Sequence, residues 1–222
     1  MTAATARRRG RPPTASQADV LRAARAQYLA GQRVDLTIVA RSLGLGRATI
    51  YRWFGSRERL LGEVIATELE ALIIRERRRV RHRGAKGLLE VFDRVNRQLA
   101  DSAALRRYVE QERAGALRLL TASDGGVQPR SVAAITELIA TEVAAGRYDP
   151  PADPQTLAYA IVRLAEAFLY NDAAFGIRGD HARLREVEAA LLGVPLAGRR
   201  PSRAASRPKV EDTGPARPAT SG

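Results

Sequence analysis

The sequence predicts an all-α protein made of two helical domains. Apolar residues recur at helical spacing along most of the 222 residues, and no alternating apolar pattern is long enough to indicate a strand. The segment Leu36–Leu61 combines a helix, a glycine turn and a second helix rich in arginine and aromatic residues. Net charge is also uneven along the chain, which separates a basic amino-terminal part from a larger balanced one.

The formal net charge of +13 is carried by three segments. Residues 1–13, 14–60 and 197–222 each have an excess of basic residues, whereas basic and acidic residues balance in 61–196. The first and last of these segments are rich in proline and poor in apolar side chains, so we expect a disordered basic arm and a disordered tail. Attraction to a polyanion therefore belongs to the two ends of the chain.

Composition excludes several classes of protein. The chain has no cysteine and only two histidines, so we expect no disulfide, no metal site and no cofactor. No run of 18 apolar residues and no signal peptide is present, which predicts a cytoplasmic protein without a membrane span. No nucleophile with a neighbouring base and no phosphate-binding loop is visible, so we expect no enzymatic activity.

Three short helices are predicted at the start of the folded chain. Ser16 and Asp19 form a capping-box pattern that begins the first helix, and Gly31 ends it. The second helix follows the N-cap Asp35 and ends at Gly44. The third helix is expected over Arg47–Phe54.

Longer helices are predicted over the rest of the chain. Gly55 and Ser56 break the chain, and Ser56 caps a long helix over Arg57–Arg83. Glycine, proline and aspartate clusters then separate further helical segments. The expected helices are Lys86–Ser102, Ala104–Thr121, Pro129–Ala145, Pro154–Phe175 and Asp180–Leu192.

The third helix has the composition of a DNA recognition helix. Ile50 and Phe54 lie four residues apart and are expected to face the core, which leaves the remaining side chains for the major groove. Arginine, threonine, tyrosine and tryptophan can donate hydrogen bonds to bases or phosphates, and helix amino termini favour phosphate. The residues expected to contact DNA are Thr37, Arg47, Ala48, Thr49, Tyr51, Arg52, Trp53 and Arg57.

An alternative is that Tyr51 to Phe54 form the edge of a core and that the arginines are a solvated face. Two aromatic residues flanked by arginine on a helix this short do not fit one core stripe, which favours the DNA-binding interpretation. In the arm, Arg9-Gly10-Arg11-Pro12 is similar to the core of a minor-groove AT-hook, in which Arg9 and Arg11 would contact DNA. The alternative for the arm is a solvated tail attracted to any phosphate.

Residues Ser16–Leu61 resemble the DNA-binding domain of the tetracycline-repressor (TetR) family of transcriptional regulators. The resemblance rests on Ala40, Leu43-Gly44, Thr49-Ile50-Tyr51, Phe54 and Arg57-Glu58 at the family's spacings. It implies a DNA-binding domain at 14–60, a ligand-binding and dimerisation domain at 61–196, and a homodimer on a near-palindromic double-stranded operator. By position it implies DNA contacts for Thr37, Arg47, Thr49, Tyr51, Trp53 and Arg57. Gly46 departs from the family, in which serine often occupies this place.

The helix predicted over Pro154–Phe175 carries a polar stripe on an otherwise apolar sequence. Tyr159, Arg163, Glu166 and Tyr170 recur on one face, and we interpret them, with Tyr108, as candidate contacts to a small polar-headed ligand. The alternative is that Arg163 and Glu166 pair with each other or across a dimer seam, or face water.

The last predicted helix is short and apolar, which suits a four-helix dimer interface made with the preceding helix. Its candidate interface residues are Leu184, Val187, Leu191 and Leu192. The segment Phe168-Leu-Tyr-Asn-Asp with Gly176-Ile resembles a QsdR-like subgroup related to the repressor of quorum-signal lactone degradation. That resemblance implies control of lactone-catabolic genes and an acyl-lactone or fatty-acid-like effector.

The arginine run at 75–83 closes the long predicted helix, and it is interpreted as a solvated face, with contact to DNA flanks as the alternative. Taken together, these features predict a homodimeric, ligand-responsive DNA-binding repressor. The alternative function is a sequence-tolerant architectural DNA-binding protein that uses its basic arm and tail.

Overall fold

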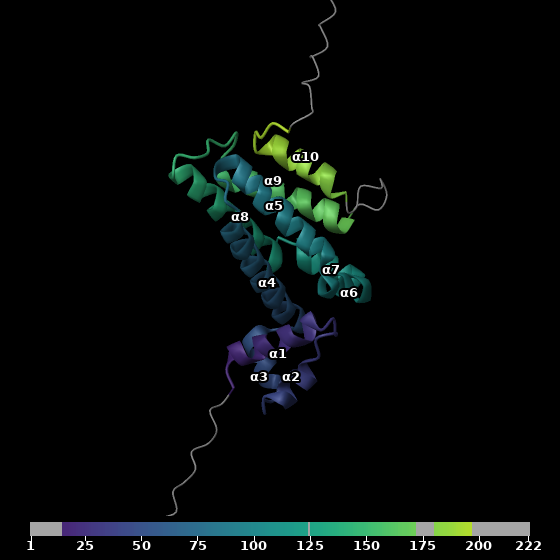
Figure 1. Cartoon of the computed structure of the whole chain (residues 1–222). Coiled ribbons are helices and arrows are strands. Elements are labelled where there is room, and N and C mark those ends of the chain that lie inside the picture. The colour runs from purple at the N-terminus through teal and green to yellow at the C-terminus, as the bar shows by residue number, and fades with distance from the viewer. Residues whose placement is uncertain (1–14, 124, 172–179, 197–222) are drawn as a thin grey trace, which may run out of the picture.

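The computed structural model describes residues 15–123, 125–171 and 180–196. Regular structure in these ranges is entirely helical, which confirms the all-α prediction (Figure 1). The elements are α1 (Gln17–Leu29), α2 (Leu36–Ser42), α3 (Arg47–Phe54), α4 (Arg57–Arg79), α5 (Gly84–Asp101), α6 (Ala103–Gln111), α7 (Arg113–Thr121), α8 (Val127–Ala144), α9 (Pro154–Glu166), the π-helical turn η1 (Ala167–Asn171) and α10 (His181–Leu191).

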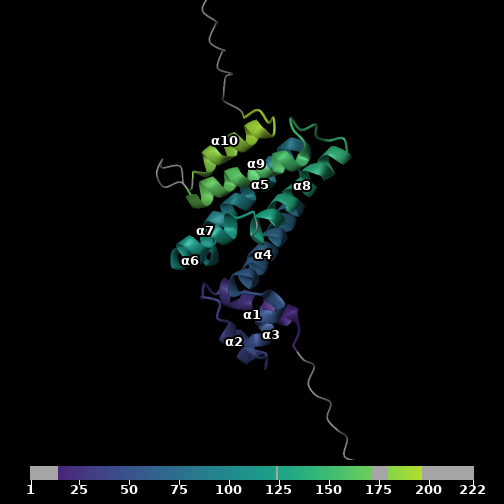
Figure 2. The same cartoon turned by 180° about the vertical axis from the view of Figure 1, so that it is seen from behind.

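The helices form a small unit and a larger bundle joined by α4. In Figure 1, α1, α2 and α3 lie together at one end, and α4 rises from them into the bundle formed by α5 to α10. The view from behind shows α8 beside α9 and α10 beside α9 at the far end of the molecule (Figure 2). No helix among the residues described is long and apolar enough to cross a bilayer.

The predicted amino-terminal caps are present. The backbone N–H of Ser16 donates to Asp19 Oδ2 at 2.7 Å, and the N–H of Asp19 donates back to Ser16 Oγ at 3.3 Å, which completes the capping box of α1. Asp35 caps α2, and the Ser56 hydroxyl caps α4 by accepting from the N–H of Arg59 at 3.1 Å. Gly44 ends α2 at a φ of +65°, a conformation that favours glycine.

Three predicted helices have different limits. The long helix ends at Arg79 rather than Arg83, because Val80 adopts an extended conformation and is buried in the core. The single helix expected over Ala104–Thr121 is two helices, α6 and α7, separated at Glu112. The helix expected over Pro154–Phe175 changes to a π-helical turn after Glu166, and its last predicted residues lie outside those described.

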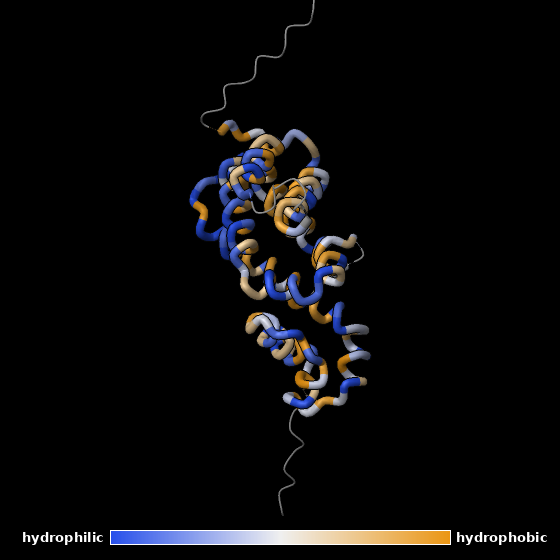
Figure 3. The backbone as a smooth tube through the Cα atoms, turned by 90° about the vertical axis from the view of Figure 1, so that its right-hand side faces the viewer, coloured by the Kyte–Doolittle hydropathy of each residue, from blue (hydrophilic) through white to orange (hydrophobic). Residues whose placement is uncertain are grey.

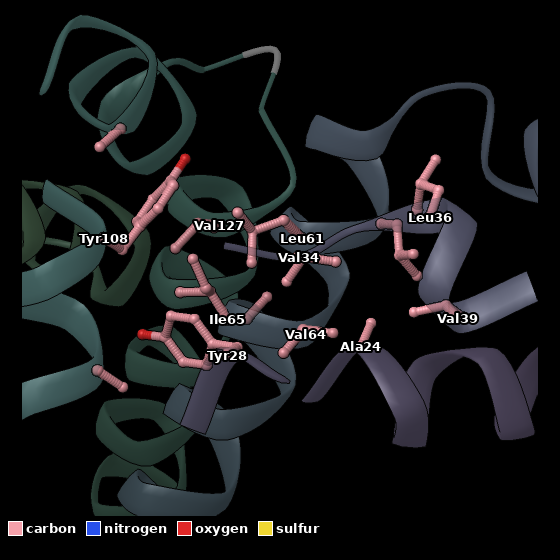
Figure 4. Close-up of a cluster of buried hydrophobic side chains, with 14 of the residues drawn as sticks. Ala24, Tyr28, Val34, Leu36, Val39, Leu61, Val64, Ile65, Tyr108 and Val127 are labelled. Carbon is pink, nitrogen blue, oxygen red and sulfur yellow. The ribbon is translucent and has the colours of Figure 1, made fainter. Parts of the chain in front are cut away.

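Buried apolar side chains form two clusters. The first, here called the lower core, joins Ile50 of α3 and Ile65 of α4 to Tyr108 of α6 and Val127 of α8. Figure 4 shows Tyr28, Ile65 and Val127, from three different helices, lying together in this cluster. The lower core therefore extends across the domain boundary expected after residue 60.

The second cluster, the upper core, lies between the far half of α4 and helices α5, α8, α9 and α10. Figure 3 shows hydrophobic and hydrophilic residues mixed along the helical parts of the chain, as expected for helices that bury one face in a core. Helices α4 and α8 therefore contribute side chains to both cores.

The arginine run at the end of α4 binds two buried carboxylates. Glu76 is fully buried and accepts from Arg79 and Arg94, each at 2.9 Å. Arg77 and Arg147 donate to Glu142 at 2.6 and 2.8 Å. Arg77 therefore ties α4 to α8, and Arg94 ties α5 to α4. The other arginines of the run, Arg75, Arg78, Arg79, Arg81 and Arg83, are exposed, as expected for a solvated face.

Candidate DNA-binding surface and ligand cavity

Helix α3 presents its polar side chains on the surface of the small unit. Its apolar residue Ile50 is fully buried, whereas Arg47, Ala48, Tyr51 and Arg52 are exposed and Thr49 is half-buried. The Arg47 guanidinium lies 5.8 Å from the centroid of the Tyr51 ring, and its Nη2 is 3.4 Å from the Tyr51 hydroxyl. This face therefore offers an arginine and a hydroxyl held side by side on one turn of helix.

The amino terminus of α3 has no side-chain cap. Gly46 occupies the N-cap with an extended backbone, and the N–H of Thr49 bonds to its carbonyl oxygen at 3.0 Å. A serine at this place would offer a hydroxyl to the first-turn N–H groups. In this chain only backbone groups are available for hydrogen bonds at the N-cap of α3.

Thr37 lies at the start of α2, where a free backbone N–H was expected to favour phosphate. The side chain of Thr37 is exposed, but its N–H donates to Asp35 Oδ1 at 2.6 Å. The hydrogen bonds from Thr37 and Ile38 lower the pKa of Asp35, so that this carboxylate stays ionised at the helix terminus. The backbone site is therefore occupied, and only the Thr37 hydroxyl remains for DNA.

Arg57 and Trp53 are placed differently from the other predicted contacts. The Arg57 side chain is only 14% exposed, and it donates to Val34 O at 2.7 Å and to both carboxylate oxygens of Glu112. Trp53 is half-buried and packs against the lower core, as the alternative interpretation of the aromatic residues expected. Arg9 and Arg11 of the arm lie outside the described residues.

An apolar cavity lies within the bundle between α4, α5, α7, α8, α9 and α10. Its volume is about 70 Å³, and most of its lining is aliphatic or aromatic, including Leu69, Phe92 and Ile161. Leu120 and Val127 of the lower core also line the cavity, so its wall is shared with the cluster that supports α3.

The predicted polar stripe is divided between the cavity and the surface. Glu166 and Tyr170 line the cavity, whereas Tyr159 and Arg163, nearer the start of α9, are exposed. Arg163 Nη1 donates to Glu166 Oε2 at 2.8 Å and to Thr121 O at 2.9 Å, which is the pairing given as the alternative. The turn η1 follows Glu166 and carries Tyr170 out of the α-helical register.

Tyr108 is not among the residues that line this cavity, and its side chain is buried in the lower core. Three polar cavity residues were not predicted, Glu188 of α10, Asn96 of α5 and Ser131 of α8. Asn96 Nδ2 donates to Glu188 Oε1 at 2.9 Å, and both residues are buried. A carboxylate in the apolar stripe Leu184, Glu188, Leu192 was the sequence signal that could have identified this pair.

The predicted dimer residues are also divided. Leu184 and Leu192 are each 1% exposed in the single chain, where they pack inside its own core, so they are unavailable for a partner. Val187 is 41% exposed and Leu191 is half-buried. Leu184 and Leu192 are buried because the apolar stripe of α10 packs the helix against α5 and α9.

A helix-turn-helix surface that shares its core with a bundle containing an apolar cavity defines the class of ligand-responsive DNA-binding regulators. A family model described as "Tetracyclin repressor-like, C-terminal domain" matches residues 83–193. The chain belongs to the TetR family of transcriptional regulators, as its helix-turn-helix residues predicted.

Solved structures of two repressors are similar to this chain. The TetR-family transcriptional repressor QsdR of R. erythropolis is 30% identical, with a TM-score of 0.73 over 82% of this chain and 96% of that one. The TetR-family repressor AlkX of Dietzia sp., implicated in biodegradation of n-alkanes, is 23% identical, with a TM-score of 0.59 over 81% of this chain and 96% of that one. The second likeness shows a shared fold. No protein of curated function matches the chain in sequence.

Proposed function

We propose that this protein is a homodimeric repressor that binds a near-palindromic operator through α3 and is released when a small apolar effector occupies the bundle cavity. The observation that carries this proposal is the shared wall of the cavity. Leu120 and Val127 line the cavity and belong to the same core as Ile50 beneath the recognition helix. A change in cavity shape therefore acts on the packing that positions α3.

The size of the cavity supports release by the effector. Pockets for small molecules usually measure about 300–1,000 Å³, so a volume of about 70 Å³ admits such a ligand only if the surrounding helices move apart. The effector then binds the expanded bundle more tightly than the compact one. This difference in affinity is the condition for shifting the protein away from its DNA-binding conformation.

The contact between Arg57 and Glu112 supports a path for that shift. Glu112 separates α6 from α7, and Leu120 at the other end of α7 lines the cavity. Movement of α7 would change the position of the carboxylate that holds Arg57 at the start of α4. Because α3 precedes α4 by two residues, the recognition helix would turn with it.

Exposed side chains on α9 and α10 support a dimer. Tyr159 is 49% exposed and Val187 is 41% exposed, and both are large enough to form the centre of an isologous interface. A two-helix face from each protomer would give a four-helix interface. The two copies of α3 would then lie about 34 Å apart, one turn of B-DNA.

The effector is proposed to be an acyl-lactone or fatty-acid-like compound. The aliphatic lining of the cavity suits an acyl chain. The resemblance of Phe168-Leu-Tyr-Asn-Asp with Gly176-Ile to the QsdR-like subgroup supports the same class. The basic arm with Arg9 and Arg11 is proposed to add minor-groove or phosphate contacts beside the operator.

The proposal is tested by selecting genomic DNA fragments with the full-length protein and mapping the protected site. A repressor protects one discrete palindromic site, and Thr49→Ala should reduce that protection. Arg118→Ala, at an exposed position of α7, should leave it unchanged. Broad protection that disappears with added salt would support the architectural alternative instead. A panel of lactones and fatty acids is then tested for release of the protein from the selected site.

A further inference from the structure

The buried pair Glu188 and Asn96 places two polar side chains in the wall of a largely apolar cavity. Glu188 is fully buried, lines the cavity, and receives one hydrogen bond, from Asn96 Nδ2 to Oε1 at 2.9 Å. Among the residues described, its second oxygen, Oε2, has no hydrogen-bond partner although it is buried. A buried polar atom without a partner is rare in a folded protein, and here it belongs to a residue that lines a cavity.

The surroundings of Glu188 favour its protonated form. Burial, together with the nearby Asp93 carboxylate, raises its pKa to about 8, against the opposing effects of Asn96 and Arg185. Because Asn96 donates to Oε1, the proton of the neutral acid lies on Oε2. Glu188 therefore presents an O–H donor without an acceptor near neutral pH.

The carboxyl groups of the cavity are unfavourable for an anion. Glu166 also lines the cavity, and its carboxylate is already paired with Arg163, whose side chain lies outside. No lysine, arginine or histidine is among the described residues that line the cavity. A carboxylate head group would consequently be buried beside two acids and without a cation, which is costly.

We propose that Glu188 and Asn96 form the head-group site of this cavity and select an apolar molecule with a neutral carbonyl oxygen over the carboxylate of the same carbon chain. The carbonyl oxygen accepts the hydrogen bond from Glu188, and the acyl chain lies among the aliphatic residues. The inference rests on the proposed function for the role of the cavity as an effector site. It narrows the effector class to esters, amides or lactones and excludes free fatty acids.

The experiment measures direct binding to the full-length protein by calorimetry near neutral pH, without DNA. The three probes are γ-octalactone, its ring-opened hydroxy acid and octylamine, which share a chain length and differ in head-group charge. We expect the lactone to bind at least about tenfold more tightly than the hydroxy acid, the difference that one well-made hydrogen bond supports. Equal or tighter binding of the hydroxy acid, or preferred binding of octylamine, would overturn the proposal.

Substitutions then test the named residue. Glu188→Gln keeps a donor and an acceptor of the same shape, so lactone affinity should stay within about threefold, whereas Glu188→Leu should lose at least about tenfold. Glu186→Gln, on the exposed face of the same helix, is the matched control and should leave lactone affinity unchanged. An unchanged lactone affinity in folded Glu188→Leu would contradict the assignment. If that variant does not fold, the comparison of the three probes on the wild-type protein still tests the proposal.

Failure of this inference and failure of the proposed function give different results. If the lactone binds through Glu188 but no discrete operator exists, the head-group site stands and the repressor function falls. If an operator exists and a carboxylate releases the protein from it, the repressor function stands and the head-group assignment falls.

Discussion

The guanidinium of Arg57 binds the carboxylate of Glu112 through both of its terminal nitrogens. Nη1 donates to Oε2 at 2.8 Å and Nη2 donates to Oε1 at 2.5 Å, in the bidentate geometry that arginine favours with carboxylates. The third nitrogen, Nε, donates to Val34 O in the connection between α1 and α2. One side chain at the start of α4 therefore joins the DNA-binding unit to the break between α6 and α7.

Breaking this pair should uncouple the two domains. Arg57→Met and Glu112→Gln should each destabilise the protein by about 1–3 kcal/mol, because each leaves a partly buried charge without its partner. In a double-mutant cycle followed by urea unfolding, the coupling energy should be about 1–2 kcal/mol. Strictly additive effects would show that the contact contributes nothing.

The same variants should weaken the response to the effector more than they weaken DNA binding. The Arg57 side chain is committed to Glu112 and Val34, so its loss alters the link between the domains and leaves the surface of α3 intact. Operator affinity with and without effector checks this expectation. A loss of affinity in the absence of effector, with the response unchanged, would instead support the direct DNA contact predicted for Arg57.

Gly46→Ser should strengthen the start of α3. The backbone of Gly46 is extended, and a Cβ at this place meets nothing within 4 Å, so serine fits without strain. A hydroxyl at the N-cap is expected to stabilise the helix by a few tenths of a kcal/mol over glycine and to add a phosphate contact. Thermal unfolding and operator affinity measure the two effects, and Gly46→Ala, which lacks the hydroxyl, is the control.

Arg47 is expected to contact the operator. Arg47→Ala should weaken binding and lower the slope of log affinity against log salt by about one if the contact is to phosphate. Arg118→Ala removes the same charge from an exposed position of α7 and should change neither quantity. Titrations at several salt concentrations measure the slope, and equal effects of the two variants would indicate only non-specific attraction.

Glu188 should make stability depend on pH in a defined direction. Its pKa is raised from about 4.5 in the unfolded chain to about 8 in the folded protein, so the folded state holds its proton where the unfolded state has lost it. Its stabilising contribution is complete below pH 4.5 and is lost as pH rises through 8, at up to about 1.4 kcal/mol per pH unit. Glu188→Gln should flatten this decline in urea unfolding between the two pH values.

Glu142 should have the opposite dependence at low pH. Hydrogen bonds from Arg147 and the N–H of Gly84 hold its pKa at about 2, against the effect of burial. The stability it contributes is present above pH 4.5 and is lost as pH falls toward 2. In urea unfolding, Glu142→Gln should therefore make the free energy of unfolding depend less on pH in the acid range. Glu188→Gln should leave this acid dependence unchanged.

Val187 tests the proposed dimer. Val187→Arg places a charge on the exposed face of α10 and should convert the dimer to a monomer, measured by light scattering during size-exclusion chromatography. Ile74→Arg changes a residue of α4 that is similarly exposed, at 52%, and should leave the dimer intact. Dissociation by Ile74→Arg alone would place the interface on α4 instead.

Local chemistry along the chain was sufficient to predict most of the helices and the family. A cap, a glycine turn and an apolar repeat act over a few residues, so Ser16, Asp35, Gly44 and Ser56 could be interpreted without knowing the fold. The same locality explains why the face of α3 was predicted: Ile50 is buried and Arg47 is exposed because the helix itself sets their directions.

The partners of buried polar groups were decided only by the tertiary structure. Arg57 and Glu112 are 55 residues apart, and Asn96 and Glu188 are 92 apart, so no periodicity relates them. A charge inside a core is tolerated only with a specific partner, and that partner is supplied by helix packing. Packing likewise buried Leu184 and Leu192 in their own chain, and it gave Glu188 the apolar surroundings on which the proposed head-group site depends.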